Sequence, residues 1–165
     1  MVPHGDEDED EDADEDGDRD RRKRAKNGDD DAPFVGRPLV PGSTGGRAAR
    51  WDGAPYLRGG TTPAGVDCSG LVQTAFQACG RPCPRDTDMM ERDLGQPLDF
   101  DASLLRRGDL VFWAGHVGMM LDGERLIHCN GYHMMTTIEP LSDALRRIAA
   151  LFGQPTSFRR PVQAQ

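Results

Sequence analysis

The sequence lacks an apolar run long enough to cross a membrane, and it lacks the apolar segment of a secretory signal near residue 1. Lysine is absent after Lys26, and the only cysteines are Cys68, Cys79, Cys83 and Cys129. These absences predict a protein without a membrane span. Taken literally, they also predict a cytoplasmic location, whose reducing conditions suit free thiols. Export to the cell envelope by a route not visible in this chain is the alternative.

Charge is distributed unevenly along the chain. Residues 1–31 contain 15 acidic and 6 basic residues, whereas residues 32–165 contain 13 acidic residues and 14 arginines. Because nucleic-acid binding requires a clustered basic surface, the nearly neutral remainder predicts no nucleic-acid partner. The basic run at residues 21–26 resembles a nuclear-localisation patch, but we interpret residues 1–31 as a disordered, low-complexity tail.

Composition divides the rest of the chain into three parts. Residues 32–53 are rich in Gly, Pro and Arg, which indicates a linker or irregular lead-in. Residues 54–161 are predicted to form one domain, and residues 162–165 a short C-terminal tail. Early in this domain, apolar residues recur at steps of three and four from Leu71 to Cys79, which predicts an amphipathic helix. Asp67 is expected at its N-cap and Gly80 just beyond its end.

The second half of the predicted domain is rich in strands. A short helix is expected over residues 88–94, strands over 109–113, 116–121, 125–129, 134–138 and 157–160, and another helix over 141–148. Turn signals at Ala114-Gly115 and Asp122-Gly123 make the strands that flank them antiparallel. Helices followed by an antiparallel meander predict an α+β domain with a sheet of about five strands.

Cys68 is the first candidate for chemistry. It directly follows the predicted N-cap, so its sulfur would lie near unpaired N–H groups and the positive end of the helix dipole. Such a position can hold the pKa of a thiol below its free value of about 8.5, which favours a nucleophile. Cys79, Cys83 and Cys129 are interpreted as packing residues, and their spacing predicts no zinc site or other metal centre.

Two histidines are candidate partners for this thiol. A thiol nucleophile needs a group that protonates the leaving group, and that group is usually histidine. His116 opens one predicted strand and His128 ends the next, so a symmetric hairpin would bring them together. One ring would then orient the other through its second nitrogen. His133 lies beyond a turn and is interpreted as a residue of the pocket rim.

Several segments together resemble the NlpC/P60 family of cell-wall cysteine peptidases. They are Tyr56-Leu57-Arg58-Gly59-Gly60, Val66-Asp67-Cys68-Ser69-Gly70-Leu71-Val72, Arg107-Gly108-Asp109-Leu110-Val111-Phe112, Gly115-His116-Val117-Gly118-Met119 and Leu126-Ile127-His128. The stretch that begins Pro84-Arg85 is also similar to the family's segment after the catalytic helix. The resemblance covers about residues 54–160, in the same order and spacing.

The resemblance implies a compact papain-like fold with a catalytic triad of Cys68, His116 and His128. It also implies a pocket tyrosine at Tyr56, no cofactor, and peptidoglycan stem peptides or muropeptides as substrates. Members of the family typically cut the bond between γ-D-glutamate and a diamino acid. Some members require a free L-alanine amino terminus, and the resemblance implies that the residues flanking the nucleophile, here Asp67 and Ser69, would recognise it.

Two other interpretations of the same residues stay open. Papain-like folds also host amidases and acyltransferases, in which the thioester passes to an acceptor other than water. A long apolar channel would favour a lipid acceptor, and none is evident in the sequence. A non-catalytic or vestigial wall-binding protein is the second alternative, and the reactivity of the Cys68 thiol distinguishes it from an enzyme.

Overall fold

The structure, a computed structural model, describes residues 43–162. The predicted acidic tail at residues 1–31 lies outside the described residues, as do residues 32–42 and 163–165. Among the described residues, no helix combines the length and the apolar character that crossing a bilayer requires.

An antiparallel sheet of six strands forms the centre of the described part, in the order β3-β8-β4-β5-β6-β7. Its strands are β3 (Gln96–Pro97), β4 (Leu110–Trp113), β5 (His116–Met120), β6 (Arg125–Asn130), β7 (Met135–Pro140) and β8 (Ser157–Arg160). β4 to β7 pair consecutively, and the two turn signals predicted the β4–β5 and β5–β6 pairs, whereas β8 returns to pair with β4. The two-residue strand β3 is the addition to the expected five, because it is too short to show a periodicity.

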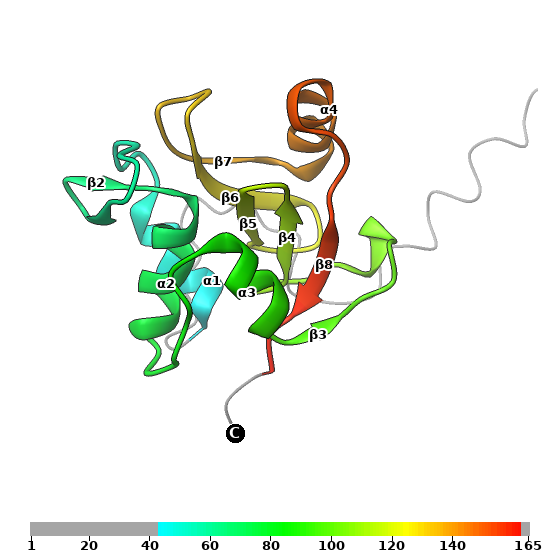
Figure 1. Cartoon of the computed structure of the whole chain (residues 1–165), viewed down its shortest axis with the longest axis horizontal. Helices are drawn as coiled ribbons and strands as arrows, with labels where there is room; N and C mark the ends of the chain where they lie inside the picture. Colours follow the sequence, from blue (N-terminus) through cyan, green and yellow to red (C-terminus); the bar gives the residue numbers. More distant parts are fainter. Residues whose placement is uncertain (1–42, 163–165) are drawn as a thin grey trace, which may run out of the picture. The chain divides into compact units, whose positions relative to one another are not determined.

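Helices border the sheet on both sides (Figure 1). They are α1 (Thr44–Ala48), α2 (Cys68–Gln77), α3 (Thr87–Asp93) and α4 (Leu141–Phe152), with short 3₁₀ turns η1 (Ala49–Trp51) and η2 (Ala102–Leu104). α2 packs against β5 and β6, and α4 packs against β6 and β7. Helices joined to an antiparallel sheet confirm the predicted α+β class.

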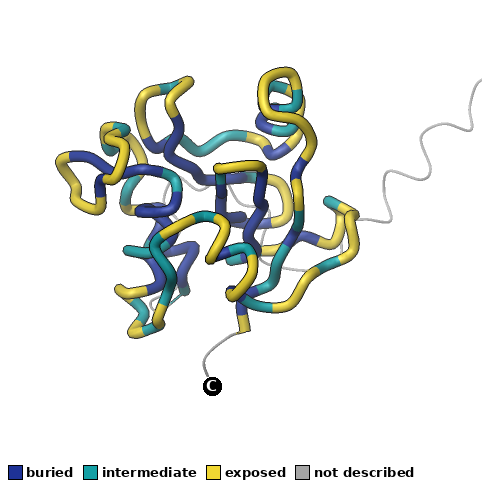
Figure 2. Tube along the Cα trace, viewed as in Figure 1, coloured by how far each residue is buried: buried dark blue, intermediate teal, exposed yellow. Residues whose placement is uncertain are grey.

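Alternation along the strands divides the core between the two faces of the sheet. The face toward α4 carries Val111, Trp113, Met120, Leu126 and Phe158, which pack with Leu141, Ala144 and Ile148 of the helix. The alternate residues that point the other way are also fully buried except for Arg125, and they are Leu110, Phe112, Val117, Met119, Ile127 and Cys129. β4, most of β5, and β6 are therefore covered on both faces, and Figure 2 shows them as the dark centre of the trace.

The N-terminal lead-in differs from the expected irregular linker over residues 32–53. Ser43 caps α1 by accepting a hydrogen bond from the Gly46 N–H, and α1 packs against α2. Glycine lowers helix propensity, so the composition predicted a loop here. The missing side chain instead allows close packing, since a Cβ on Gly45 would lie 3.2 Å from Cγ of Arg107.

A close backbone approach fixes the start of α2. The strands β1 (Thr61–Thr62) and β2 (Gly65–Val66) form a small hairpin whose base, at Gly60, lies against the first turn of α2. A Cβ on Gly70 would lie 2.2 Å from the Gly60 carbonyl oxygen. Only glycine fits this contact, which lets the first turn of the helix that carries Cys68 pack directly against the backbone at the base of the hairpin.

We expect Gly70→Ala to lower the free energy of unfolding by about 1–3 kcal/mol, because the new methyl group would force the hairpin and helix apart. Urea denaturation measures this change. Gln77→Ala, at the exposed end of the same helix, is the matched control and should stay within about 0.5 kcal/mol of the parent. A Gly70→Ala protein as stable as the control would contradict the close approach.

Candidate active site

The first turn of α2 presents Cys68 to a cleft. Cys68 is the first residue of the helix, and Asp67 caps it by accepting a hydrogen bond of 2.7 Å from the Gly70 N–H. This confirms the predicted N-cap. The positions of Leu71, Val72, Ala75 and Phe76 explain the orientation, because burying this apolar stripe leaves the preceding polar turn at the edge of the core.

Asp67 also joins three separate segments. Its second oxygen accepts a hydrogen bond of 2.7 Å from the Gly59 N–H and pairs with Arg85 at 2.8 Å. Arg85 in turn donates to the Ser69 hydroxyl at 2.6 Å. Burial alone would raise the pKa of Asp67, but the hydrogen bonds from Arg85, Gly70 and Gly59 outweigh it and hold the pKa below its usual value. The side chain is therefore an ionised anchor for the loop, the helix and the segment after it.

The pKa of the Cys68 thiol is raised, whereas the helix-dipole argument predicted a lowered pKa. Burial is the largest influence and raises its pKa, and the charge of Asp67 raises it further. Hydrogen bonds from the backbone N–H groups of Val117 and Ser69 act in the opposite direction without cancelling the burial. Near neutral pH a raised pKa favours the protonated thiol over the thiolate.

His116 lies where the β4–β5 hairpin turns. Trp113 and His116 form the last pair before Ala114-Gly115, and Gly115 has the positive φ of 74° that this tight turn requires. The buried Trp113 indole packs beside the imidazole with ring centroids 5.6 Å apart. The hairpin thus holds the half-buried His116 ring at the end of the sheet, where the cleft opens.

The structure brings the two predicted histidines together. Nε2 of His116 lies 2.8 Å from Nδ1 of His128, which is fully buried on the neighbouring strand β6. Burial is the main cause that lowers the pKa of His116 to about 3, and the nearby His128 ring adds to it. Burial also lowers the pKa of His128, against the influence of Glu139. Both rings are neutral near pH 7, and His116 keeps Nδ1 as its unshared nitrogen.

Glu139 and Arg147 complete this cluster and were missed by the sequence analysis. Nε2 of His128 lies 2.7 Å from Glu139 on β7, and both carboxylate oxygens of Glu139 pair with the guanidinium of Arg147 on α4. A usable signal existed, because His128 lies opposite Thr137 and Glu139 follows two residues later on the same face. Without knowledge of how β6 and β7 are paired, Glu139 and Arg147 could not be distinguished from ordinary surface charges.

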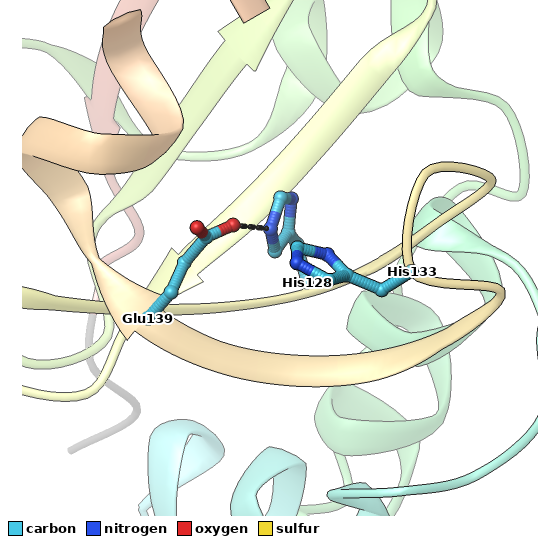
Figure 3. A group of neighbouring side chains, drawn as sticks. All are labelled: His128, His133 and Glu139. Carbon is cyan, nitrogen blue, oxygen red and sulfur yellow. Dashed lines mark hydrogen bonds and ion pairs between the residues drawn. The ribbon is translucent and has the colours of Figure 1, made fainter. Parts of the chain in front are cut away.

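His128, His133 and Glu139 converge closely enough to suggest a metal centre, with one potential donor atom of each within 4.8 Å of the others (Figure 3). Their polar atoms are already engaged, however. His128 forms a hydrogen bond with Glu139, and Nδ1 of His133 lies 3.1 Å from the Asn130 oxygen. Arg147 forms an ion pair with Glu139. A cation would have to displace Arg147, so the arrangement fits a hydrogen-bonded cluster better than a metal centre.

The cleft beside Cys68 has two chemically different sides. One side is a cavity of about 450 Å³ that also contains His116. Its wall is largely apolar, with Tyr132, Ile148, Leu151 and Phe152, and also includes Asn130 and Arg147. The other side is polar and is lined by Arg58, Asp67, Ser69, Arg85 and Thr87. Tyr56, Cys68 and Gly115 belong to both sides. His133 does not line either side, so it is not the rim residue that was expected.

Tyr56 lies at the junction of the two sides. Burial, and then the nearby Cys68, raise the pKa of its hydroxyl, which therefore keeps its proton near neutral pH. A protonated phenol can donate a hydrogen bond to a developing negative charge. Of the six site residues expected from the sequence, Tyr56, Cys68 and the two histidines line the apolar side, and Tyr56, Asp67, Cys68 and Ser69 line the polar side.

Comparison with known proteins gives a consistent result. Residues 53–147 match the model of the NlpC/P60 family. The γ-D-glutamyl-L-lysine dipeptidyl-peptidase of Bacillus subtilis is 38% identical over 85 residues, which are 46% of this chain and 27% of that protein. The murein DD-endopeptidase MepS/murein LD-carboxypeptidase of Escherichia coli K12 is 39% identical over 88 residues, which are 50% of this chain and 45% of that protein.

A solved structure shows the same fold. The peptidoglycan hydrolase RipB from Mycobacterium tuberculosis superposes with a TM-score of 0.58 and 27% identity, over 72% of this chain and 62% of RipB. The chain matches less than half the length of the two curated relatives above. The shared part is the domain that carries the cleft.

The raised pKa of Cys68 leads to a prediction about alkylation. Because the thiolate is the reacting species, iodoacetamide should modify Cys68 of the folded protein with a pH midpoint above about 8.5, the value of a free thiol. Mass spectrometry of the Cys68 peptide measures the rate, and the same peptide in the urea-unfolded protein is the control. A folded midpoint below the unfolded one would show instead that the protein holds a thiolate–imidazolium pair.

Proposed function

The chain belongs to the NlpC/P60 family, and from that membership we propose that it is a thiol endopeptidase acting on peptidoglycan stem peptides. The scissile bond we propose is the amide between γ-D-glutamate and a diamino acid. One observation carries the proposal. Cys68, at the start of a helix, lines the same cavity as His116, whose second ring nitrogen is held by His128. A nucleophile, a base and an orienting group are the parts that thiol-dependent acyl transfer requires.

The proposed reaction proceeds in two steps. Nδ1 of His116 accepts the Cys68 proton while the sulfur attacks the γ-carbonyl carbon of D-glutamate. The C–N bond then breaks, His116 returns the proton to the departing amine, and a thioester remains on Cys68. In the second step His116 takes a proton from water, the hydroxide attacks the thioester carbonyl, and the thiol leaves with the proton from His116. Neutral starting forms of both groups suit this sequence, because the base must be unprotonated before each attack.

Charge on the tetrahedral oxygen needs hydrogen-bond donors. The N–H groups in the first turn of a helix have no intrahelical acceptor, and Cys68 lies in that turn. We assign the Cys68 N–H and the Tyr56 hydroxyl to this oxygen. Tyr56 supports the assignment because it contributes to both sides of the cleft and stays protonated.

The two sides of the cleft suggest how a substrate lies. His116 protonates the leaving amine, so the amine side of the substrate occupies the apolar cavity that contains His116. The acyl side then occupies the polar side, where Asp67 and Ser69 would meet an amino-terminal L-alanine. Because Asp67 is already paired with Arg85, an ammonium group would share its carboxylate with that guanidinium.

One observation favours a second candidate reaction. Tyr132, Leu151 and Phe152 are 69%, 71% and 64% exposed, and all three wall the cavity beside Cys68. An apolar wall suits an acyl or amine group less polar than a diamino acid. An amidase or acyltransferase acting through the same thioester is therefore the alternative.

Incubation with L-Ala-γ-D-Glu-meso-diaminopimelate, followed by mass spectrometry, tests the proposal. We expect release of L-Ala-D-Glu. Cys68→Ala should lose at least about 10³-fold in kcat/KM, and His116→Ala about 10²–10⁴-fold. His128→Ala should have a smaller effect than His116→Ala. Cys79→Ala, just beyond the same helix, is the matched thiol control and should cleave at the parent rate.

The outcomes of this assay separate the alternatives. Equal cleavage of free and N-blocked peptides would restrict Asp67 and Ser69 to a structural role. A folded protein that alkylates at Cys68 but releases no dipeptide would favour the amidase or acyltransferase. Full activity of Cys68→Ala would overturn the mechanism.

Tyr56→Phe tests the second oxyanion donor. Loss of one such donor typically costs about 10²–10³-fold in kcat, and we expect the KM to change little because the oxyanion exists only after attack. Steady-state kinetics on the same tripeptide separates the two constants. A Tyr56→Phe protein with the parent kcat and a raised KM would assign the hydroxyl to substrate binding instead.

A further inference from the structure

The ring nitrogen of His128 that faces away from His116, Nε2, forms a short hydrogen bond with a carboxylate. Nε2 of His128 lies 2.7 Å from an oxygen of Glu139, and the His128 ring is fully buried. Glu139 is itself held by Arg147, with one N–O distance of 2.6 Å, and the two side chains are only 12% and 20% exposed. An ion pair thus lies directly behind the two histidines, shielded from most of the solvent.

The position of one proton follows from this contact. Burial would raise the pKa of Glu139, but the hydrogen bonds from Arg147 and His128 outweigh it and lower the pKa to about 2. An ionised carboxylate has no proton to donate, so the proton between Glu139 and His128 resides on Nε2 of His128.

Asn130 is the other polar neighbour of Nε2 and does not change this assignment. Its oxygen accepts a hydrogen bond of 2.8 Å from the His133 N–H, so its amide nitrogen is the atom turned toward Nε2. That nitrogen lies 3.2 Å from Nε2, farther than the carboxylate of Glu139. The shorter, charge-assisted contact determines the proton position.

The proton on His128 determines the proton on His116. A neutral His128 protonated at Nε2 has its lone pair at Nδ1, where it accepts a hydrogen bond from Nε2 of His116 at 2.8 Å. His116 then carries its proton on Nε2, and its Nδ1 is the basic nitrogen. The opposite tautomer would place a proton on the nitrogen that has to accept one from Cys68.

We propose that Glu139 and Arg147 are positioning residues for the reaction: Glu139 selects the tautomers of His128 and His116, and Arg147 neutralises the carboxylate behind them and so adds to burial in keeping His128 neutral. This inference rests on the proposed function, in which His116 is the base.

Both charges are needed because they act on His128 in opposite directions. Glu139 on β7 favours the protonated ring, whereas Arg147 on α4 and His133 in the β6–β7 turn disfavour it. His116 on β5 occupies the remaining polar side of the ring. Burial is the largest influence that keeps His128 neutral, and Arg147 adds to it, so loss of Arg147 would raise the pKa of His128. In the imidazolium that this favours, Nδ1 of His128 donates, so Nε2 of His116 has to accept and the His116 proton moves to Nδ1.

Two substitutions therefore have distinguishable effects. Glu139→Gln removes the obligate acceptor, and its amide can also donate, so the tautomers of both histidines should mix. We expect kcat to fall about 10–100-fold with KM unchanged. The acid limb of the pH profile should move to lower pH, because the carboxylate that favours protonated rings is gone. Arg147→Gln should instead move the acid limb of kcat/KM to higher pH, and Arg147→Lys should restore it in part by returning the charge.

Arg146→Gln is the matched control, because Arg146 is the next residue on α4 and forms only an exposed ion pair with Asp143. It should keep the parent rate and pH profile. Nitrogen-15 NMR of the histidine side chains reports the tautomers directly and needs no substrate. In the parent, His116 should show a protonated Nε2 and an unprotonated Nδ1, and Glu139→Gln should shift the Nδ1 signal toward the protonated value.

The outcomes separate this inference from the proposed function. A parent protein that cleaves no peptide but changes its His116 tautomer in Glu139→Gln would overturn the function and support the positioning role. A parent that cleaves the peptide while its tautomers and pH profile are indifferent to both substitutions would overturn the positioning role alone. If Glu139→Gln and Arg147→Gln lose activity and thermal stability equally, without a change of tautomer or pH profile, the positioning role is also overturned. The Glu139–Arg147 ion pair would then have a structural role only.

Discussion

The carboxylate of Asp67 makes the interactions on which the position of Cys68, the proposed nucleophile, depends. It caps α2 through Gly70, fixes the loop before β1 through Gly59, and pairs with Arg85 beyond the helix. Each of these contacts alone contributes on the order of 1 kcal/mol, as caps and hydrogen bonds typically do. Together they tie three chain segments to one buried, ionised group. Cys68, as the next residue, has little freedom relative to the sheet.

Burial governs the chemistry on the other side of the cleft. β5 and β6 place two imidazoles where solvation is poor, and poor solvation disfavours a proton on either ring. A charged pair in such a place is costly unless it is well bonded, and Glu139 and Arg147 meet that condition with two N–O contacts and the hydrogen bond from His128. The environment thus keeps the thiol and the base neutral while leaving a fixed negative charge behind them.

Local patterns allowed much of the fold and site to be predicted. The helix from Cys68 followed from apolar spacing between a capping Asp67 and Gly80, and the meeting of His116 with His128 followed from two turn signals that set the hairpins. Features that depend on tertiary structure were not predictable in the same way. Glycines at Gly45 and Gly46 pointed to a loop, although close packing makes them helical. The protonation of Cys68 depends on how deeply the folded chain buries it, which no helix-dipole argument contains.

Arg147 lies on α4, late in the sequence, and this affects the order in which the site assembles during synthesis. The thiol of Cys68 leaves the ribosome well before Arg147 does, because a chain grows at about 5–20 residues per second. β8 comes later still, yet it pairs with β4 beside the hairpin that carries His116. During synthesis the thiol therefore emerges several seconds before Arg147 and β8. The sheet around the cluster of His116, His128, Glu139 and Arg147 is complete only after the last described strand has been made.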